Sequence, residues 1–214
     1  MENYKVLVFD WDGTLFDSMQ YKHKNAFLAL QEFNWANEEK IIKIHSEITG
    51  LPRKILFNSI ALSLRGKPFT DKEYGKISDL YTSLNKKSAR QANVFPEVLE
   101  FLLKITKKIP VYVSSSADVN EVNFAANFHN VKNYFSELLG STPGFSKGKE
   151  HLNYISSKEK VNLKQLIFVG DDVQDVKLGN EANVFTLRIM RAVSNKKENY
   201  PVINQLTELE KYFV

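Results

Sequence analysis

The amino-acid sequence predicts an α/β fold in which helices cover a parallel sheet and a helical region is inserted after the first strand. The short apolar run at residues 4–9 is typical of a buried parallel strand. Residues 17–90 show helical patterns and no strand-like alternation. From residue 95 onward, helical segments alternate with short apolar runs, which indicates parallel strands joined by right-handed crossovers.

The inserted region is expected to be helical throughout. Asp17 and Ser18 can cap its first helix, and the loop at residues 50–53 precedes the third. Thr70 and Glu73 fit a capping box at the start of the fourth helix. The expected helices cover approximately residues 17–33, 38–48, 54–64 and 71–90.

The second half of the chain is expected to alternate between the two kinds of element. Strands are predicted at residues 111–113, 138–139, 166–169 and 184–187. Helices are predicted at residues 96–107 and 119–128, after residue 147, from about residue 175, and at residues 204–213. We therefore predict a core domain formed by residues 1–16 and 91–214, and a helical cap domain at residues 17–90.

Composition excludes several classes of protein. Hydrophobic residues make up 43% and charged residues 25% of the 214-residue chain, an ordinary balance for a soluble globular protein. No apolar run has the length of a membrane span and no signal peptide is visible, so we expect a cytoplasmic protein without membrane partners. The absence of cysteine excludes disulfides and thiolate metal ligands. We expect a monomer or a weak homodimer.

The distribution of charge indicates which kinds of partner the protein can bind. Lysine and arginine number 29 against 25 acidic residues, which gives a mild net charge of +4. The lysines are scattered, and no basic block interleaved with aromatic residues suggests a nucleic-acid groove. We expect no nucleic-acid partner, whereas a small anionic substrate is compatible with this charge.

The segment that follows the first strand carries the strongest chemical signal. It has the sequence Asp10-Trp11-Asp12-Gly13-Thr14-Leu15. Ligands of open α/β sheets bind at the carboxyl ends of the strands, and Gly13 allows a tight turn there. Two carboxylates at positions i and i+2 can hold a divalent cation, attack an electrophile, or divide these tasks. For an isolated pair, two solvated acids at a turn would be the simpler interpretation.

Two further segments place polar groups after predicted strands. The hydroxyls of Ser114, Ser115 and Ser116 follow the strand at residues 111–113 and can donate hydrogen bonds to an anion. A serine-rich turn with an N-cap is the alternative. Lys147 follows a Gly/Pro loop at the start of a helix, where the helix dipole disfavours a cation, so it can have another task, such as a contact with phosphate. Lys149 is a nearby competitor, and an exposed surface lysine is the alternative.

A last acidic segment follows the strand at residues 166–169. It has the sequence Gly170-Asp171-Asp172-Val173-Gln174-Asp175. Carboxylates around a strand-to-helix turn can bind a hard cation, although an aspartate at a helix start can also be a simple cap.

With these four motifs in this order, the chain resembles the haloacid dehalogenase-like (HAD) hydrolase superfamily, in particular its phosphatases with a helical cap. The match runs from Val6 to about Leu187, and residues 10–15 fit the first motif of the superfamily without a mismatch. The resemblance implies a Rossmann-like three-layer core with an inserted cap. It also implies Mg²⁺-dependent phosphoryl transfer through an aspartyl-phosphate. Relatives often carry Pro-Gly where this chain has Pro96 and Glu97, a departure at a helix start away from the chemistry.

The resemblance also implies a role for each motif residue. Asp10 would be the nucleophile, and Asp12 would protonate the leaving alcohol and then deprotonate water. Mg²⁺ would bind the Asp10 carboxylate, the Asp12 backbone carbonyl and Asp171. Asp175 would orient Lys147 or bind a metal-coordinated water. The phosphate would contact, in this interpretation, Gly13, Ser115, Ser116 and Lys147, with Ser114 as the alternative to Ser115.

The acid at position 12 favours a reaction on phosphate esters, because superfamily members that dehalogenate or cleave C–P bonds lack an acid at this position. We expect a phosphatase acting on a small phosphorylated metabolite, such as a sugar phosphate or a phosphoglycolate-like acid. A phosphomutase of the β-phosphoglucomutase type is the closest alternative, and a non-catalytic protein that binds phosphorylated metabolites is another. Arg53, less so Lys54, would contact a second polar or anionic group of the substrate, or else lie exposed at a helix start.

Overall fold

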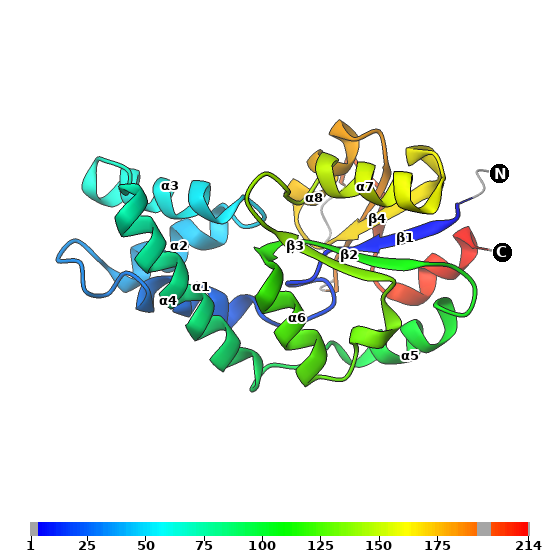
Figure 1. The fold of residues 1–214 in the computed structure, drawn as a ribbon, viewed down its shortest axis with the longest axis horizontal. Helices are drawn as coiled ribbons and strands as arrows, with labels where there is room; N and C mark the ends of the chain where they lie inside the picture. The colour runs from blue at the N-terminus through cyan, green and yellow to red at the C-terminus, as the bar shows by residue number, and fades with distance from the viewer. Residues whose placement is uncertain (1–3, 192–197, 214) are drawn as a thin grey trace.

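A computed structural model describes residues 4–191 and 198–213. Within these residues, six strands form one sheet in the order β3-β2-β1-β4-β5-β6, and every pair is parallel (Figure 1). The parallel sheet predicted from the apolar runs is therefore confirmed. The strands are β1 (Val6–Phe9), β2 (Val111–Asp118), β3 (Glu137–Ser141), β4 (Leu166–Gly170), β5 (Phe185–Ile189) and β6 (Val202–Ile203).

The central strand β1 explains where the motifs meet. Its four residues are all buried, and Val8 pairs with Tyr112 of β2 on one side and with Phe168 of β4 on the other. Because these strands are parallel and in register, their carboxyl ends lie side by side at one edge of the sheet. Asp10 therefore begins its loop next to the serines of β2 and the loop that follows β4.

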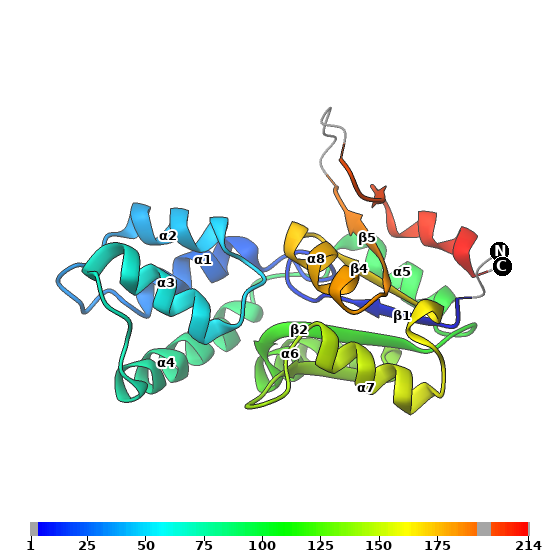
Figure 2. The same cartoon turned by 90° about the horizontal axis from the view of Figure 1, so that it is seen from above.

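Helices cover both faces of the sheet (Figure 1), and Figure 2 shows the same arrangement from above. Successive β1 side chains alternate between two hydrophobic clusters: Leu7 and Phe9 belong to one, and Val6 and Val8 to the other. The first cluster includes residues of α5 (Pro96–Ile105) and α6 (Val119–Phe128), and the second those of α7 (Lys149–Glu159). This is the expected Rossmann-like three-layer arrangement.

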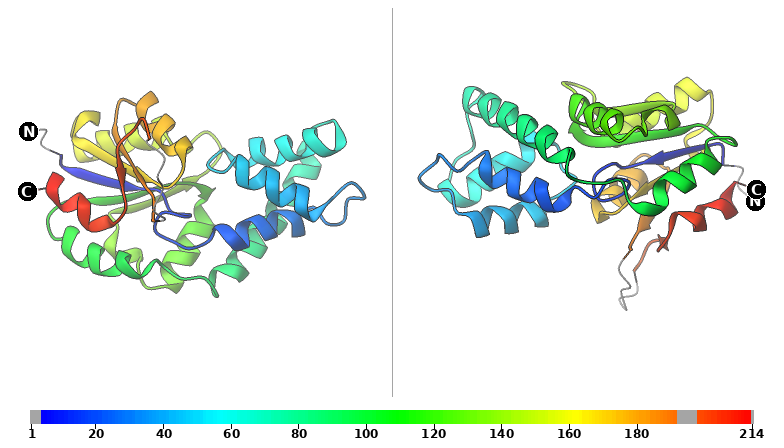
Figure 3. Two further views of the ribbon diagram at one scale, coloured as in Figure 1. Left: turned by 180° about the vertical axis from the view of Figure 1, so that it is seen from behind. Right: turned by 90° about the horizontal axis from the view of Figure 1, so that it is seen from below.

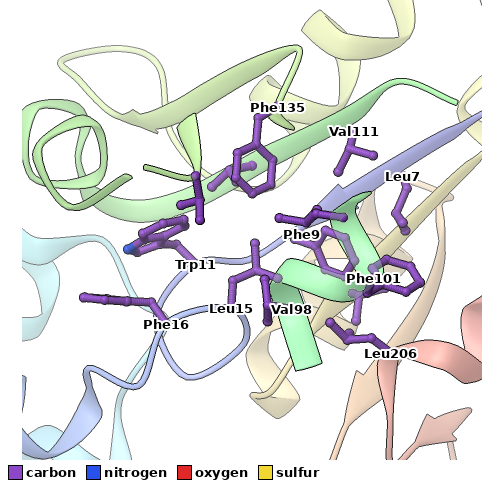
Figure 4. Packing of buried hydrophobic residues seen from close by; sticks show 14 of the residues in the cluster. Leu7, Phe9, Trp11, Leu15, Phe16, Val98, Phe101, Val111, Phe135 and Leu206 are labelled. Carbon is purple, nitrogen blue, oxygen red and sulfur yellow. The ribbon is translucent and has the colours of Figure 1, made fainter. Parts of the chain in front are cut away.

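The first cluster also fixes the loop after β1. Trp11, Leu15 and Phe16 are almost fully buried in this cluster, which also contains Phe9 (Figure 4). The Trp11 ring stacks on that of Phe16, with 5.4 Å between the ring centres. The apolar side chains of this loop thus anchor the backbone that carries the two acids.

The inserted region forms four α-helices within the described residues. They are α1 (Met19–Leu28), α2 (Glu38–Glu47), α3 (Arg53–Arg65) and α4 (Asp71–Ala89). They lie at one end of the molecule, beyond the sheet (Figures 1 and 3), and bury a separate hydrophobic cluster that includes Leu30, Phe57 and Ile60. The predicted capping box of Thr70 and Glu73 is present. We keep the division into a core (residues 1–16 and 91–214) and a cap (17–90) as a proposal.

The ends of several strands and helices differ from those predicted. Strand β2 continues to Asp118 because it pairs again with β3 after a shift in register. Helix α1 ends at Leu28, and the ring of Phe33 stacks on that of Trp35 beyond it. Residues 206–212 form a 3₁₀ helix, and the two-residue strand β6, which is too short to give a pattern, was not predicted. None of the helices in the described ranges has the length and apolarity needed to cross a bilayer.

Candidate active site

One cavity of about 80 Å³ lies between the carboxyl edge of the sheet and the inserted helices. The second half of β2 and the loops after β1, β3 and β4 reach it from the core, and residues of all four inserted helices reach it from the opposite side. Seven of the predicted site residues line it: Asp10, Asp12, Arg53, Ser115, Ser116, Lys147 and Asp171. Gly13 and Asp175 do not line it, but they contact the lining residues Asp171 and Lys147, respectively. The cavity has room for a small ligand.

Lys147 lies in the loop before α7 and forms two buried ion pairs. Its Nζ is 2.8 Å from Asp10 Oδ1 and 2.5 Å from Asp175 Oδ1. Burial alone would lower the pKa of Lys147, but Asp10 and Asp175 together raise it above the ordinary value. The side chain is therefore a permanent cation in contact with Asp10. Its competitor Lys149 is exposed at the start of α7.

Three carboxylates converge around this lysine. Asp10, Asp171 and Asp175 each offer an oxygen, and these oxygens lie within 4.8 Å of one another. Burial raises the pKa of Asp10, and Asp175 and Asp171 raise it further against the opposing effect of Lys147. Burial and the neighbouring Asp175 raise the pKa of Asp171 to about 6. Three acids facing one lysine leave an excess of negative charge, and such a set of oxygens fits a hard divalent cation.

Asp12 faces different partners from Asp10. Its carboxylate accepts a hydrogen bond of 2.6 Å from the Ser18 hydroxyl and forms an ion pair with Lys22 of α1. The carboxylate therefore points toward the inserted helices and away from the acidic cluster, so only the Asp12 backbone carbonyl remains as a candidate metal ligand. Lys22 is itself buried, and its pKa is raised because Asp12 and Glu121 outweigh the effect of burial.

Sequence reasoning missed Lys22. A signal was present, because Ser18 and Lys22 are four residues apart and such positions share one face of a helix. The backbone N–H of Lys22 donates to the Ser18 carbonyl, which places both side chains beside Asp12. The helix carries other charged residues, so the sequence did not distinguish Lys22 from a solvent-exposed lysine. Its burial becomes evident only from its contact with Asp12 in the folded structure.

The three serines after the β2 apolar run point to different places. Ser115 lines the cavity, and its Oγ accepts a hydrogen bond of 3.1 Å from the Ala117 N–H. Ser114 is fully buried and contacts His151 Nδ1 at 3.0 Å, so it does not line the cavity. The Ser116 hydroxyl donates to the Gly50 carbonyl in the loop before α3. Of the two alternatives, Ser115 is the one that the fold brings to the cavity.

Gly13 packs directly against Asp171. Its φ of +80° lies in the left-handed region, and a Cβ at this position would come within 2.3 Å of Asp171 Oδ2. The Thr14 hydroxyl donates a hydrogen bond of 2.9 Å to Asp171 Oδ1. Glycine is therefore required for the loops after β1 and β4 to approach each other this closely.

Arg53 reaches the cavity wall, but its donors bind protein atoms. Its guanidinium contacts Glu121 of α6 at 2.6 Å and the Thr82 hydroxyl at 2.8 Å, and it lies over the Tyr81 ring. Lys54 is exposed and pairs with Asp71. The structure thus places Arg53 between the inserted helices and the core.

Comparison with known proteins agrees with this geometry. The model of the haloacid dehalogenase-like hydrolase family matches residues 7–189. The chain belongs to this family. The predicted family, fold class and assignment as a hydrolase are confirmed.

Individual relatives are distant. A phosphoglycolate phosphatase of Haemophilus influenzae (strain Rd) is 25% identical over 185 residues, which cover 84% of this chain and 82% of the relative. The structure of a predicted phosphoglycolate phosphatase from Haemophilus somnus aligns with a TM-score of 0.77 at 20% identity, over 99% of this chain and 98% of that one. A predicted phosphatase from Clostridium acetobutylicum aligns with a TM-score of 0.78 at 20% identity, over 97% of both chains. These two likenesses concern the fold.

Proposed function

We propose that this chain is a Mg²⁺-dependent phosphatase that hydrolyses a small phosphorylated metabolite through an aspartyl-phosphate formed on Asp10. The observation that carries the proposal is the buried Asp10 carboxylate, which contacts Lys147 and has Asp171 and Asp175 beside it. The curated relatives, named phosphoglycolate phosphatases, favour a small phosphorylated acid as substrate. The cytoplasmic location and the monomeric or weakly dimeric state remain predictions.

The acidic cluster would hold the cation. The Asp10 carboxylate, the Asp12 backbone carbonyl and Asp171 would bind Mg²⁺, and Asp175 would orient Lys147 through its ion pair. When bound, the ion supplies positive charge that offsets the repulsion between the nucleophile and a phosphate dianion.

The phosphoryl group would bind next to Asp10. Lys147 and Ser115 would contact its non-bridging oxygens, with Ser116 at the outer edge of the same wall. Gly13 contributes by letting the first loop approach Asp171. Positioning the phosphorus in line with the attacking oxygen is the main task of such a site, because phosphoryl transfer needs little covalent assistance.

The two acids would act in sequence. A carboxylate oxygen of Asp10 forms a bond to phosphorus while the ester P–O bond breaks, and Asp12 gives its proton to the leaving oxygen. Asp12 then takes a proton from water, which attacks the phosphorus of the aspartyl-phosphate and releases phosphate and free Asp10. Contact with Ser18 and Lys22 keeps the Asp12 carboxylate on the side of the inserted helices, where the leaving group would lie.

Asp10→Asn tests the proposal. The amide cannot act as this nucleophile, so release of phosphate from phosphoglycolate and from a panel of small phosphate esters should fall at least about 1,000-fold. Asp79→Asn, at an exposed position of α4, is the matched control and should retain wild-type turnover. Removal of Mg²⁺ with EDTA should abolish wild-type activity. Turnover that survives both EDTA and Asp10→Asn would exclude the mechanism.

The same preparations separate the alternatives. A phosphomutase converts a hexose 1-phosphate into the 6-phosphate and needs a bisphosphate activator, whereas a phosphatase releases inorganic phosphate. A non-catalytic binding protein would bind phosphorylated metabolites with equal affinity in the wild type and in Asp10→Asn, and would release no phosphate from either. Product analysis after incubation with each ester decides between the three.

A further inference from the structure

Two arginines near the end of β5 contact the loops that carry the acidic cluster. Arg191, two residues beyond β5, donates from Nη1 to the Gly13 carbonyl at 3.1 Å and from Nη2 to the Thr14 carbonyl at 2.7 Å. Arg188, within β5, donates from Nε to the Asp171 carbonyl at 2.8 Å. One arginine therefore binds the loop after β1, and the other binds the loop after β4.

These two loops are also joined to each other. The Thr14 hydroxyl donates to the Asp171 carboxylate, and Gly13 leaves no space for a side chain between the loops. The carbonyls that Arg191 binds thus belong to the residues that contact Asp171 directly. A shift of this short loop would move the Asp171 oxygen relative to Asp10, which begins the same loop.

Other groups fix Arg191 in this orientation. Its Nε donates to Glu97 at 2.7 Å, and its guanidinium lies 3.7 Å from the centre of the Phe95 ring. A planar guanidinium can donate in several fixed directions at once and stack on an aromatic face, which an ammonium cannot do. Glu97 is the residue that stands where relatives often carry glycine. It lies at the start of α5, yet it is connected to the acidic cluster through Arg191.

We propose that Arg191, assisted by Glu97 and Arg188, is a positioning residue that sets the spacing of the Asp10 and Asp171 carboxylates for cation binding. This inference rests on the proposed function. A partly exposed ion pair between Arg191 and Glu97 would by itself contribute little to stability. The two contacts with the Gly13 and Thr14 carbonyls connect this ion pair to the site. In metal sites, residues that hydrogen-bond to the ligands orient those ligands, and we assign Arg191 a similar task.

The test is calorimetric titration of the full chain with MgCl₂, which requires no turnover. Arg191→Met should raise the Mg²⁺ dissociation constant by about 10-fold, the lower end of the range for groups that orient metal ligands. Arg191→Lys should recover only part of the loss, because an ammonium cannot reach both carbonyls and Glu97 together. Glu97→Gln keeps the arginine and should weaken binding by a smaller factor, which provides a milder variant if Arg191→Met does not fold.

Arg65 supplies a closely matched control. It donates to the carbonyls of Lys67 and Pro68, pairs with Glu73 and lies over the Phe69 ring, all within the inserted region. Arg65→Met removes the same kinds of contact away from the acidic cluster and should leave Mg²⁺ affinity unchanged. Equal affinity in the wild type and all Arg191 and Glu97 variants, or equal loss in Arg65→Met, overturns the inference alone. A wild-type chain that binds no Mg²⁺ overturns the proposed function as well.

Discussion

At the scale of single residues, the two acids of the first motif have separate environments although only one residue lies between them. Asp10 is still next to the sheet and contacts Lys147, whereas the chain turns after it and directs Asp12 toward Ser18 and Lys22. The sequence places Ser18 and Lys22 on one face of a helix, but it does not show that this face lies against Asp12, because that contact depends on tertiary packing. This separation is what allows one acid to face the phosphoryl group and the other to face the leaving group.

Lys22→Met tests the role of this lysine. Methionine keeps much of the apolar stem and removes the ammonium, so Asp12 retains only Ser18 as a partner. We expect kcat for phosphoglycolate hydrolysis to fall by about 10- to 100-fold, because a small misplacement of a catalytic group has costs of this size. Steady-state kinetics measures the effect. Lys24→Met, at an exposed position of the same helix, is the control, and an unchanged kcat in Lys22→Met would exclude the role.

At the scale of elements, the sequence was most accurate for strands that show an apolar pattern in their own residues. The buried strands β1 and β4 are continuous apolar runs, and two of the four strand-end motifs, those with the acids, follow them directly. The second half of β2 is polar and is extended only because it pairs with β3, so its length was underestimated. Arg191 was also missed, because its partners Gly13 and Thr14 are more than 170 residues away in the sequence.

Glu121 of α6 connects elements that no local pattern joins. Its buried carboxylate pairs with Arg53 of α3 and accepts a hydrogen bond from Asn85 of α4. Glu121→Gln would leave the largely buried Arg53 side chain without its counter-charge, so we expect the free energy of unfolding to fall by about 3 kcal/mol. Glu100→Gln, which breaks an exposed pair with Lys104, should cost less than about 0.5 kcal/mol. Urea unfolding measures both, and equal losses would contradict the interpretation.

At the scale of the whole molecule, the site depends on two separately packed parts at once. The sheet edge supplies Asp10, Lys147 and Asp171, and the inserted helices, which bury a cluster of their own, supply Lys22. Each part also buries a histidine. Burial lowers the pKa of His45 in the inserted helices to about 3 and that of His151 in the core to about 4. Acid should therefore destabilise both parts of the molecule.

His151 allows this pH dependence to be measured. Its folded-state pKa of about 4 lies below the ordinary value of 6.5, so the unfolded chain takes up the proton first as the pH falls. Its contribution to stability is therefore complete above pH 6.5 and is lost progressively toward pH 4. In His151→Asn, an amide can keep the contact with the Ser114 hydroxyl but does not titrate. Between pH 7.5 and pH 5, the wild type should lose about 2 kcal/mol more unfolding free energy than this variant. Urea unfolding at the two pH values gives the difference, and parallel losses would show that His151 does not contribute to acid sensitivity.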